Sequence, residues 1–309
     1  MQSGPAPREI ACDESGYEGE KLVGGETDVF AHASVYLTPE SAAGCVVELR
    51  RRIRSPALEY KANYLLREKH RSALVWLLGP RGPLGGAACV HLVDKAFLLV
   101  DRLVGDGAPG SDAARALYRA GREAPHRAHW HAFLAAANDV LRPRNRQDAR
   151  AAGSLADTVR ALRTGMPAEA GAVLLELGDP RGGGGLLDPL VPAIVRAVDR
   201  WSDGGRLAVS VVHDRQTALT QERVATIAHL AGTPGGRPVG LCFVESRTDP
   251  RVQVADFIAG VARKVASDDL AGRNDPELVA LLRPYVDPAS LWGDDRSWAR
   301  LAPAAVDLA

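Results

Sequence analysis

Three aspartates far apart in the chain lie beside or inside apolar runs that are expected to be buried. Asp13 follows an apolar run at 10–12, Asp214 follows the run at 207–213, and Asp256 lies within 252–260. A buried carboxylate costs several kcal/mol of desolvation unless something pairs with it. A divalent cation is the one partner that could satisfy all three acids together. The chain must therefore adopt a fold that gathers these acids or gives each its own partner.

Composition places the chain among globular proteins and limits its partners. The 309 residues suffice for one large domain or two ordinary ones, and the apolar fraction of 46% predicts a substantial core. The formal net charge is zero, which argues against strong non-specific binding of nucleic acid but leaves room for a local basic groove. Arginine greatly outnumbers lysine and Ala, Gly and Pro are frequent, a composition associated with GC-rich bacterial genomes.

The cysteines and the ends of the chain indicate a cytoplasmic protein. Cys12, Cys45, Cys89 and Cys242 form no Cys-x-x-Cys pair, so they are expected to be small buried hydrophobes in a reducing compartment. The polar, proline-containing start has no signal-peptide core, and no apolar stretch approaches the roughly 20 residues that cross a bilayer. We expect no membrane association.

Hydrophobic patterning predicts an α/β fold built on five strands. Alternating and apolar runs predict strands at 8–14, 29–37, 87–93, 207–213 and 239–245. Thr38 as N-cap and Pro39 begin a helix that should reach Arg54. Further helices are predicted at 58–78, 96–104, 111–122, 128–141, 155–163, 187–201, 219–231, 252–267 and 276–283. The order predicts a mixed five-stranded sheet flanked by helices, in a single domain spanning 1–309, with a helical insertion at 106–204 before strand four.

Four short motifs, in this order along the chain, resemble those of the domain of unknown function 3800 family. They are Asp13-Glu14-Ser15-Gly16, then Glu59 and Lys61, then Asp214 at a strand end, and finally Ser246, Gln253, Asp256 and Gly260. The resemblance covers the sheet at both ends of the chain and only loosely the middle. It implies a ribonuclease H-like fold and a metal-dependent nuclease, and fold transfers better than function in such a comparison.

The residues themselves point to the same chemistry. Mg²⁺ and Mn²⁺ prefer carboxylates and water, and two such ions about 3.5–4 Å apart can bind the attacking and leaving oxygens of a phosphodiester. We expect Asp13 to bridge the ions, with Asp214 and Asp256 completing the coordination. Glu14 is a further candidate ligand, although strand alternation directs it to the opposite face from Asp13.

The remaining candidates surround this set. Gln253, Asp256 and Gly260 are spaced to share one helix face, and the glycine would let that face approach the sheet closely. We expect Gln253 to hold a ligand carboxylate or substrate. The other candidates are Ser15 and Ser246 for substrate binding, and Glu59 and Lys61 for catalysis, with Lys61 neutralising a phosphate.

Each assignment has a purely structural alternative. Asp256 could pair with Arg263 or Arg251 at the edge of its helix, and Asp13 or Asp214 could serve as an ordinary turn residue. Glu59 and Lys61 could form a surface ion pair worth less than about 1 kcal/mol.

Other motifs are interpreted as structural. His126, His129 and His131 are expected to be solvated helix residues rather than a zinc site, and the glycines at 182–185 a flexible linker. The basic run at 49–54 and the arginines at 142, 144 and 146 are interpreted as solvated basic patches on the surface of the protein.

The sequence therefore favours a metal-dependent phosphodiesterase with Mg²⁺ or Mn²⁺ as cofactor, acting on nucleic acid or a nucleotide. Two alternatives stay open. One is a non-catalytic binding or assembly module that contacts a protein partner through the helical insertion, and the other is a hydrolase of a small phosphorylated metabolite.

Overall fold

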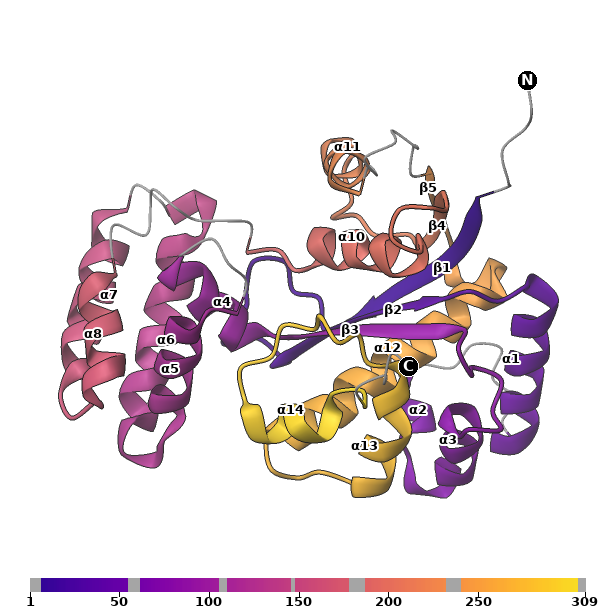
Figure 1. Ribbon diagram of the computed structural model, residues 1–309, viewed down its shortest axis with the longest axis horizontal. Helices are drawn as coiled ribbons and strands as arrows, with labels where there is room; N and C mark the ends of the chain where they lie inside the picture. The colour runs from indigo at the N-terminus through magenta and orange to yellow at the C-terminus, as the bar shows by residue number, and fades with distance from the viewer. Residues whose placement is uncertain are drawn as a thin grey trace.

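The computed structural model describes residues 7–54, 62–105, 110–145, 148–177, 187–231 and 240–304. A five-stranded sheet with the order β3-β2-β1-β4-β5 forms its centre (Figure 1). The strands are β1 (Arg8–Ser15), β2 (Val29–Val35), β3 (Ala88–Asp94), β4 (Val209–Asp214) and β5 (Gly240–Val244). β2 is antiparallel to β1 and β3, whereas β4 is parallel to β1 and β5. The prediction of a mixed five-stranded α/β sheet is confirmed.

Helices cover both faces of this sheet, and a further group lies at one end of it (Figure 1). The face with the larger core is covered by α1 (Pro39–Ile53), α2 (Ala62–Leu65), α3 (Arg71–Leu78), α12 (Pro250–Leu270), α13 (Pro276–Leu282) and α14 (Asp295–Leu301). The other face carries α10 (Leu190–Trp201) and α11 (Gln221–Leu230). The remaining helices are α4 (Lys95–Val104), α5 (Asp112–Arg122), α6 (Arg127–Leu141), α7 (Ala149–Arg163) and α8 (Ala168–Glu176).

Local sequence signals account for the helix ends that matter most here. The Thr38 side chain accepts a hydrogen bond from the Ser41 backbone amide at 3.2 Å, and Arg54 ends α1 in the left-handed conformation, as a C-cap often does. At the start of α12, the Asp249 side chain accepts from the Arg251 backbone amide at 2.9 Å, with Pro250 in the first turn.

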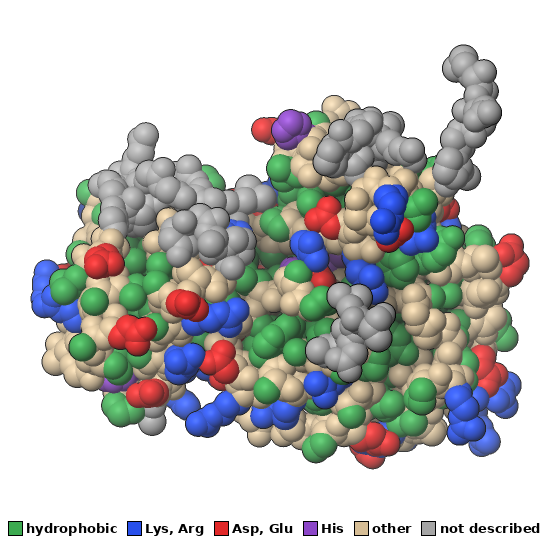
Figure 2. All heavy atoms as spheres, viewed as in Figure 1, with side chains coloured by type: hydrophobic (Ala, Val, Ile, Leu, Met, Phe, Trp, Pro, Cys, Tyr) green, Lys and Arg blue, Asp and Glu red, His purple; other side chains and the backbone are tan. Residues whose placement is uncertain are grey.

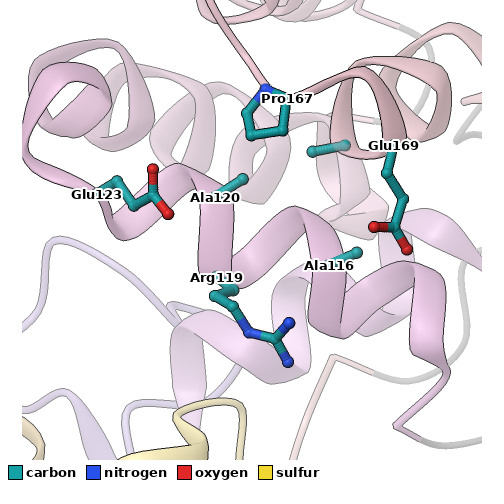
Figure 3. A pocket seen from close by; sticks show the side chains of 7 residues that line it. Ala116, Arg119, Ala120, Glu123, Pro167 and Glu169 are labelled. Carbon is teal, nitrogen blue, oxygen red and sulfur yellow. The ribbon is translucent and has the colours of Figure 1, made fainter.

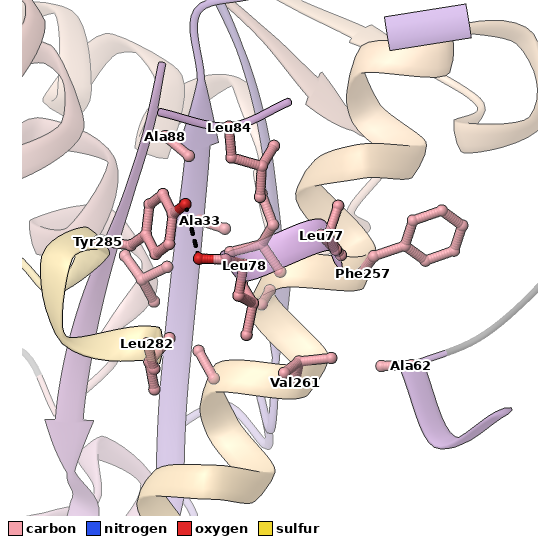
Figure 4. Close-up of a cluster of buried hydrophobic side chains, with 14 of the residues drawn as sticks. Ala33, Ala62, Leu77, Leu78, Leu84, Ala88, Phe257, Val261, Leu282 and Tyr285 are labelled. Carbon is pink, nitrogen blue, oxygen red and sulfur yellow. Dashed lines mark hydrogen bonds between the residues drawn. The ribbon is translucent and has the colours of Figure 1, made fainter. Parts of the chain in front are cut away.

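The long helix α12 buries twelve of its 21 residues, nearly all of them apolar or small, against the sheet and neighbouring helices. Figure 4 shows part of this core, in which Leu77 of α3 lies beside Phe257 of α12. The Tyr285 hydroxyl donates to the Leu78 carbonyl oxygen at 3.1 Å, which satisfies a polar group in an apolar layer.

Strand alternation divides β1 between the two faces of the sheet. Ala11 belongs to the core beneath α12, whereas Ile10 and Cys12 pack with residues of α10. Asp13 therefore faces α12 and Glu14 faces α10.

The structure also differs from the prediction in places. The predicted helix at 58–78 is interrupted at Arg67, whose backbone is extended, and only α2, a 3-10 turn and α3 are described there. His70 stacks on Tyr64 with ring centroids 4.9 Å apart and Arg67 lies over the same ring at 4.4 Å, so side-chain packing holds the break. Helices α8 and α14 were not predicted.

The middle of the chain contributes to two regions. α5, α6, α7 and α8 lie side by side at one end of the sheet (Figure 1). α10, the last helix of the predicted insertion, instead packs Ala197, Val198 and Trp201 against the sheet. Within the described residues, none of the helices combines the length and apolar character that a membrane span requires.

Candidate carboxylate site

Asp13 and Asp214 lie at corresponding positions on neighbouring parallel strands. Cys12 of β1 is aligned with His213 of β4, and each aspartate is the next residue along its strand. Adjacent strands are about 4.8 Å apart. Val212 belongs to the core beneath α12, so alternation directs Asp214 to that face, as it does Asp13.

Asp256 approaches the same place from the covering helix. α12 packs across β1, and Asp256 is half-buried within it. The Asp13 carboxyl group, 5% exposed, lies close enough to Asp256 and Asp214 for both to act on it electrostatically. The structure thus brings Asp13 together with two aspartates that lie more than 200 residues later in the sequence.

The surroundings of Asp13 disfavour its ionised form. Burial raises the pKa of Asp13 from 3.8 to about 9, helped by the negative charges of Glu14, Asp256 and Asp214. A hydrogen bond from the Glu14 backbone amide to Oδ1, 2.8 Å long, opposes this shift only in part. Without a cation, Asp13 therefore keeps its proton at neutral pH.

Other predicted residues lie around this cluster. The Ser246 backbone amide donates to Asp214 Oδ1 at 2.9 Å and so fixes that carboxylate. The Ser15 hydroxyl accepts from Arg263 Nε at 2.9 Å, which brings a guanidinium to this end of β1. Burial lowers the pKa of Arg263, since its charge is partly removed from water. Gln253 is half-buried in α12, one helical turn before Asp256.

The two arginines weighed as partners for Asp256 each contact a residue of β1. Arg251 donates to Glu9 Oε1 at 2.5 Å and to Asp249 Oδ2 at 2.6 Å. Arg263 Nε donates to the Ser15 hydroxyl oxygen. Arg251 is thereby held near the start of β1 and Arg263 at its end.

Gly260 permits a close approach, although its nearest neighbour is not the sheet. A Cβ atom at this position would lie 2.2 Å from the Ala62 Cβ of α2 and 3.9 Å from the Ser15 hydroxyl oxygen. The predicted contact with β1 is therefore looser than the contact with α2.

Glu14 lies on the opposite face, where it meets histidines that the sequence analysis did not identify. Gln216 Nε2 donates to Glu14 Oε1, and Glu14 Oε2 lies 3.7 Å from His213 Nε2. That Oε2 atom is buried and has no hydrogen-bond partner among the residues that the structure describes. His213 in turn faces His32 across the sheet, with 3.3 Å between their Nε2 atoms. A single histidine inside each of several apolar strand runs was the signal available in the sequence.

The acids converge without forming a finished metal cage. Among the residues that the structure describes, no three His, Cys, Asp or Glu side chains are arranged to hold a metal ion as they stand. Glu59 and Lys61 lie outside the described residues, so their predicted roles remain predictions.

The competing motifs have structural explanations where they are described. His129 and His131 are exposed on α6 as predicted, whereas the prediction of a solvated His126 is wrong, since it is buried just before that helix. Arg51 and Arg52 both pair with Glu48 on the surface of α1. The glycines at 182–185 and Arg146 lie outside the described residues. The cysteines are free. Cys242 was predicted to be buried but is exposed, because it lies in the edge strand β5.

Cavities elsewhere do not involve the acid cluster. One of about 130 Å³ lies between α5 and α8 and is lined by Arg119, Glu123, Pro167, Glu169 and three alanines (Figure 3). A smaller one of about 40 Å³ lies near His91 and Asp188.

Neither the molecular surface nor the comparisons with known proteins assign a function to the chain. On the described part of the face shown in Figure 2, positive and negative side chains are interspersed and form no continuous basic band. No family model matches the chain, and neither a curated protein nor a solved structure matches it.

Proposed function

We propose that this chain is a divalent-metal-dependent phosphodiesterase of the nuclease type, built on a ribonuclease H-like fold. The observation that carries the proposal is the convergence of Asp214 and Asp256 on Asp13, whose pKa is raised to about 9 by burial and by neighbouring carboxylates. Buried acids placed beside other acids are characteristic of sites that bind a cation or perform acid–base chemistry. The mixed sheet with β1 at its centre supports the fold assignment.

The chemistry of three carboxylates suits Mg²⁺ or Mn²⁺, and the described side chains would have to move to enclose such an ion. Carboxylate oxygens are the ligands these ions prefer, and the side chains acting most strongly on Asp13 are all acids. The residues that would hold the metal are Asp13, Asp214 and Asp256, which share the α12 face. Glu14, predicted as a further ligand, lies on the other face of β1 and contributes only its charge from there. When bound, such an ion supplies charge neutralisation at a phosphoryl group and acidifies water.

The protein's own residues prepare the site in two ways. Asp13 is protonated in the metal-free protein near pH 7, so binding of a cation releases a proton from this carboxyl group. The backbone amides of Glu14 and Ser246 hold Asp13 and Asp214 in place before any ligand arrives. This fixed arrangement reduces the reorganisation needed when charge develops in the substrate.

The substrate is proposed to be a phosphodiester in nucleic acid or a nucleotide. Arg263, which contacts Ser15, is proposed to contact a phosphate, and Ser246 and Gln253 are proposed to orient the substrate. The zero net charge favours local recognition over long electrostatic tracking.

The test uses Asp13→Asn and Asp256→Asn, which each replace a carboxyl group with an amide of nearly the same shape. Asp157→Asn is the matched control, since Asp157 is an exposed residue of α7 paired with Arg160. Mn²⁺-dependent cleavage is assayed on single- and double-stranded DNA, RNA, hybrid duplexes and nucleotides, and circular dichroism checks folding.

We expect each site variant to lose at least about 100-fold in kcat and the control to retain full activity, since removal of one charge-stabilising group typically costs this much. Near-wild-type hydrolysis by either site variant would contradict the proposal. A wild-type chain that binds no Mn²⁺ at millimolar concentration would favour the binding-module alternative instead.

A further inference from the structure

The small cavity near His91 lies on the α10 face of the sheet, opposite the face that carries the acid cluster. His91 of β3 and Arg102 of α4 are two of the side chains that line it. Its volume is about 40 Å³, where roughly 10–15 Å³ suffices for one water molecule. The cavity can therefore hold a group of a few heavy atoms.

Asp287 holds the His91 ring in one orientation. His91 Nδ1 lies 2.9 Å from Asp287 Oδ2. Burial would raise the pKa of Asp287, but this hydrogen bond and the charges of His91 and Arg196 keep it below its usual value. The ionised carboxylate only accepts, so Nδ1 carries the hydrogen. His91 Nε2 makes no hydrogen bond to any residue that the structure describes, and it belongs to a side chain that lines the cavity.

Backbone hydrogen bonds attach the segment that carries Asp287 to the edge of β3. The Asp287 amide donates to the Val90 carbonyl oxygen at 2.8 Å, and the Leu291 amide donates to the Leu92 carbonyl oxygen at 2.9 Å. The pair of His91 and Asp287 is therefore fixed before any ligand binds, which lowers the entropy that binding would cost.

Two arginines beside this pair have unsatisfied donors. Arg102 Nη1 lies 3.2 Å from Asp101 Oδ2, and Arg196 of α10 lies 3.4 Å from Asp199 and 3.5 Å from Asp287. The Nε atoms of both arginines are buried and have no hydrogen-bond partner within the described parts of the chain. Such donors are unfavourable unless an acceptor reaches them.

Arginines elsewhere in the chain form closer pairs. Arg71 donates to the two carboxylate oxygens of Asp275 at 2.5 Å and 2.9 Å, and Arg300 donates to those of Asp269 at 2.8 Å and 3.0 Å. A guanidinium group is a planar fork that matches a carboxylate or a phosphate. The looser contacts beside the cavity therefore leave room for a further acceptor.

The acids around the cavity are already paired. Asp188, which lines it, lies 2.6 Å from Arg223 Nη1 and accepts from the Tyr17 hydroxyl at 2.5 Å. Asp101 accepts from the Gly110 backbone amide at 2.6 Å. Their charges are thus balanced within the fold and leave the cavity open to an anion.

We propose that this cavity binds a small oxyanion of the phosphate class, with His91, Arg102 and Arg196 as its contacts. Arg196 lies one helical turn after Pro192, which lines the cavity. His91 Nε2 accepts the hydrogen of a monoprotonated phosphate, or donates when the ring is protonated, and the guanidinium groups donate to the remaining oxygens. The site involves no metal ion and lies away from Asp13, so it goes beyond the proposed function.

The test follows the ³¹P resonance of inorganic phosphate, and separately of methyl phosphate, as the full chain is added in EDTA. Arg102→Gln removes the charge, and Arg102→Lys keeps the charge without the planar fork. Arg160→Gln is the matched control, because Arg160 lies 3.1 Å from Asp157 on the exposed surface of α7, a pairing similar to that of Arg102. Thermal unfolding verifies that each variant is folded.

We expect saturable binding by the wild-type chain and at least about tenfold weaker binding by Arg102→Gln, as removal of a charge-assisted hydrogen bond predicts. Arg102→Lys should lose less, and the control should change by less than about twofold. His91→Phe, which keeps a ring without nitrogens, should also bind more weakly. If that variant does not fold, the two Arg102 variants decide.

The two probes identify the source of the phosphate group. Tighter binding of inorganic phosphate supports a site for the free ion, whereas tighter binding of methyl phosphate supports a site for the phosphoryl end of a larger molecule. Absence of saturable binding of either probe at millimolar concentration, or an equal loss in Arg102→Gln and Arg160→Gln, overturns the inference. The proposed function is tested separately by Mn²⁺-dependent cleavage, and its failure would leave this site standing.

Discussion

The two faces of the sheet bury aspartates in opposite electrostatic surroundings. On the α10 face, burial would raise the pKa of Asp287, but the hydrogen bond from His91 and the charges of His91 and Arg196 lower it below its usual value. On the α12 face, burial and three neighbouring acids raise the pKa of Asp13 to about 9. Burial alone therefore does not decide how a carboxyl group ionises, because the neighbouring charges determine the outcome.

The contrast also indicates which acid needs a partner from outside the chain. Asp287, 2% exposed, lies 2.9 Å from His91 Nδ1 and 3.5 Å from Arg196 Nη2, so its charge is balanced within the fold. Asp13 is surrounded by acids that gain stability together if a cation binds. Four predictions test this difference, beginning with the largest expected effect.

The stability of the metal-free protein should fall as the pH rises, and Asp13→Asn should remove much of that fall. The pKa of Asp13 is near 3.8 unfolded and about 9 folded, so between these values the folded state holds a proton that the unfolded state releases. The free energy of unfolding then decreases by up to about 1.4 kcal/mol per pH unit. Urea unfolding in EDTA at pH 5, 6, 7 and 8 measures it. Parallel pH profiles for wild type and Asp13→Asn would show that Asp13 is not perturbed.

Mg²⁺ should stabilise the wild-type chain and not the Asp13→Asn variant. A ligand that binds only the folded state at 100 times its Kd adds about 2.7 kcal/mol to the free energy of unfolding. The effect should be larger at pH 8 than at pH 6, because the cation competes with the proton on Asp13. Thermal unfolding with and without Mg²⁺ measures the shift in Tm. Equal shifts in both proteins would place the cation elsewhere.

Asp287→Asn should destabilise the fold and leave Mn²⁺ affinity unchanged, the reverse of Asp13→Asn. Removal of this charge leaves His91 and Arg196 with a weaker partner, which costs about 1–3 kcal/mol. Because the folded pKa of Asp287 is depressed, its contribution is complete above 3.8 and is lost as the pH falls through the lower folded value. Urea unfolding at pH 7 and calorimetry with Mn²⁺ check both parts. Weakened Mn²⁺ binding would mean that the two faces are coupled.

Gly260→Ala should have the smallest effect on stability. It tests how closely α12, which covers the acid cluster, packs against α2. The added Cβ would lie 2.2 Å from the Ala62 Cβ, and overpacking of this kind costs about 1–3 kcal/mol, partly offset by the better helix propensity of alanine. Gly44 of α1 is the matched control because nothing lies within 4 Å of its added Cβ, and Gly44→Ala should stabilise by up to about 1 kcal/mol. A net gain in stability for Gly260→Ala would show that α2 moves aside easily.

Local signals in the sequence were sufficient to predict most elements of the sheet. The apolar runs of β1, β2 and β3 and the Thr38 cap of α1 are short-range features, and they appear where they were expected. The break at Arg67 depends on Tyr64 packing against His70, a contact that no helical periodicity predicts. α14 is a single short helix in a polar segment, so its pattern is weak.

The acid cluster could be predicted from the sequence, whereas the contact between His32 and His213 could not. Asp13, Asp214 and Asp256 were identifiable because each acid interrupts or ends an apolar run. His32 and His213 also lie in apolar strands, but their contact depends on the order β2-β1-β4 across the sheet, which becomes known only with the topology.

The most direct measurement is a titration of the Asp13 carboxyl group, followed by its side-chain ¹³C resonance in the metal-free protein and again with Mg²⁺. We predict a midpoint near 9 without metal and a carboxylate already ionised at pH 7 when Mg²⁺ is bound. A midpoint near 4 that does not respond to Mg²⁺ would contradict it.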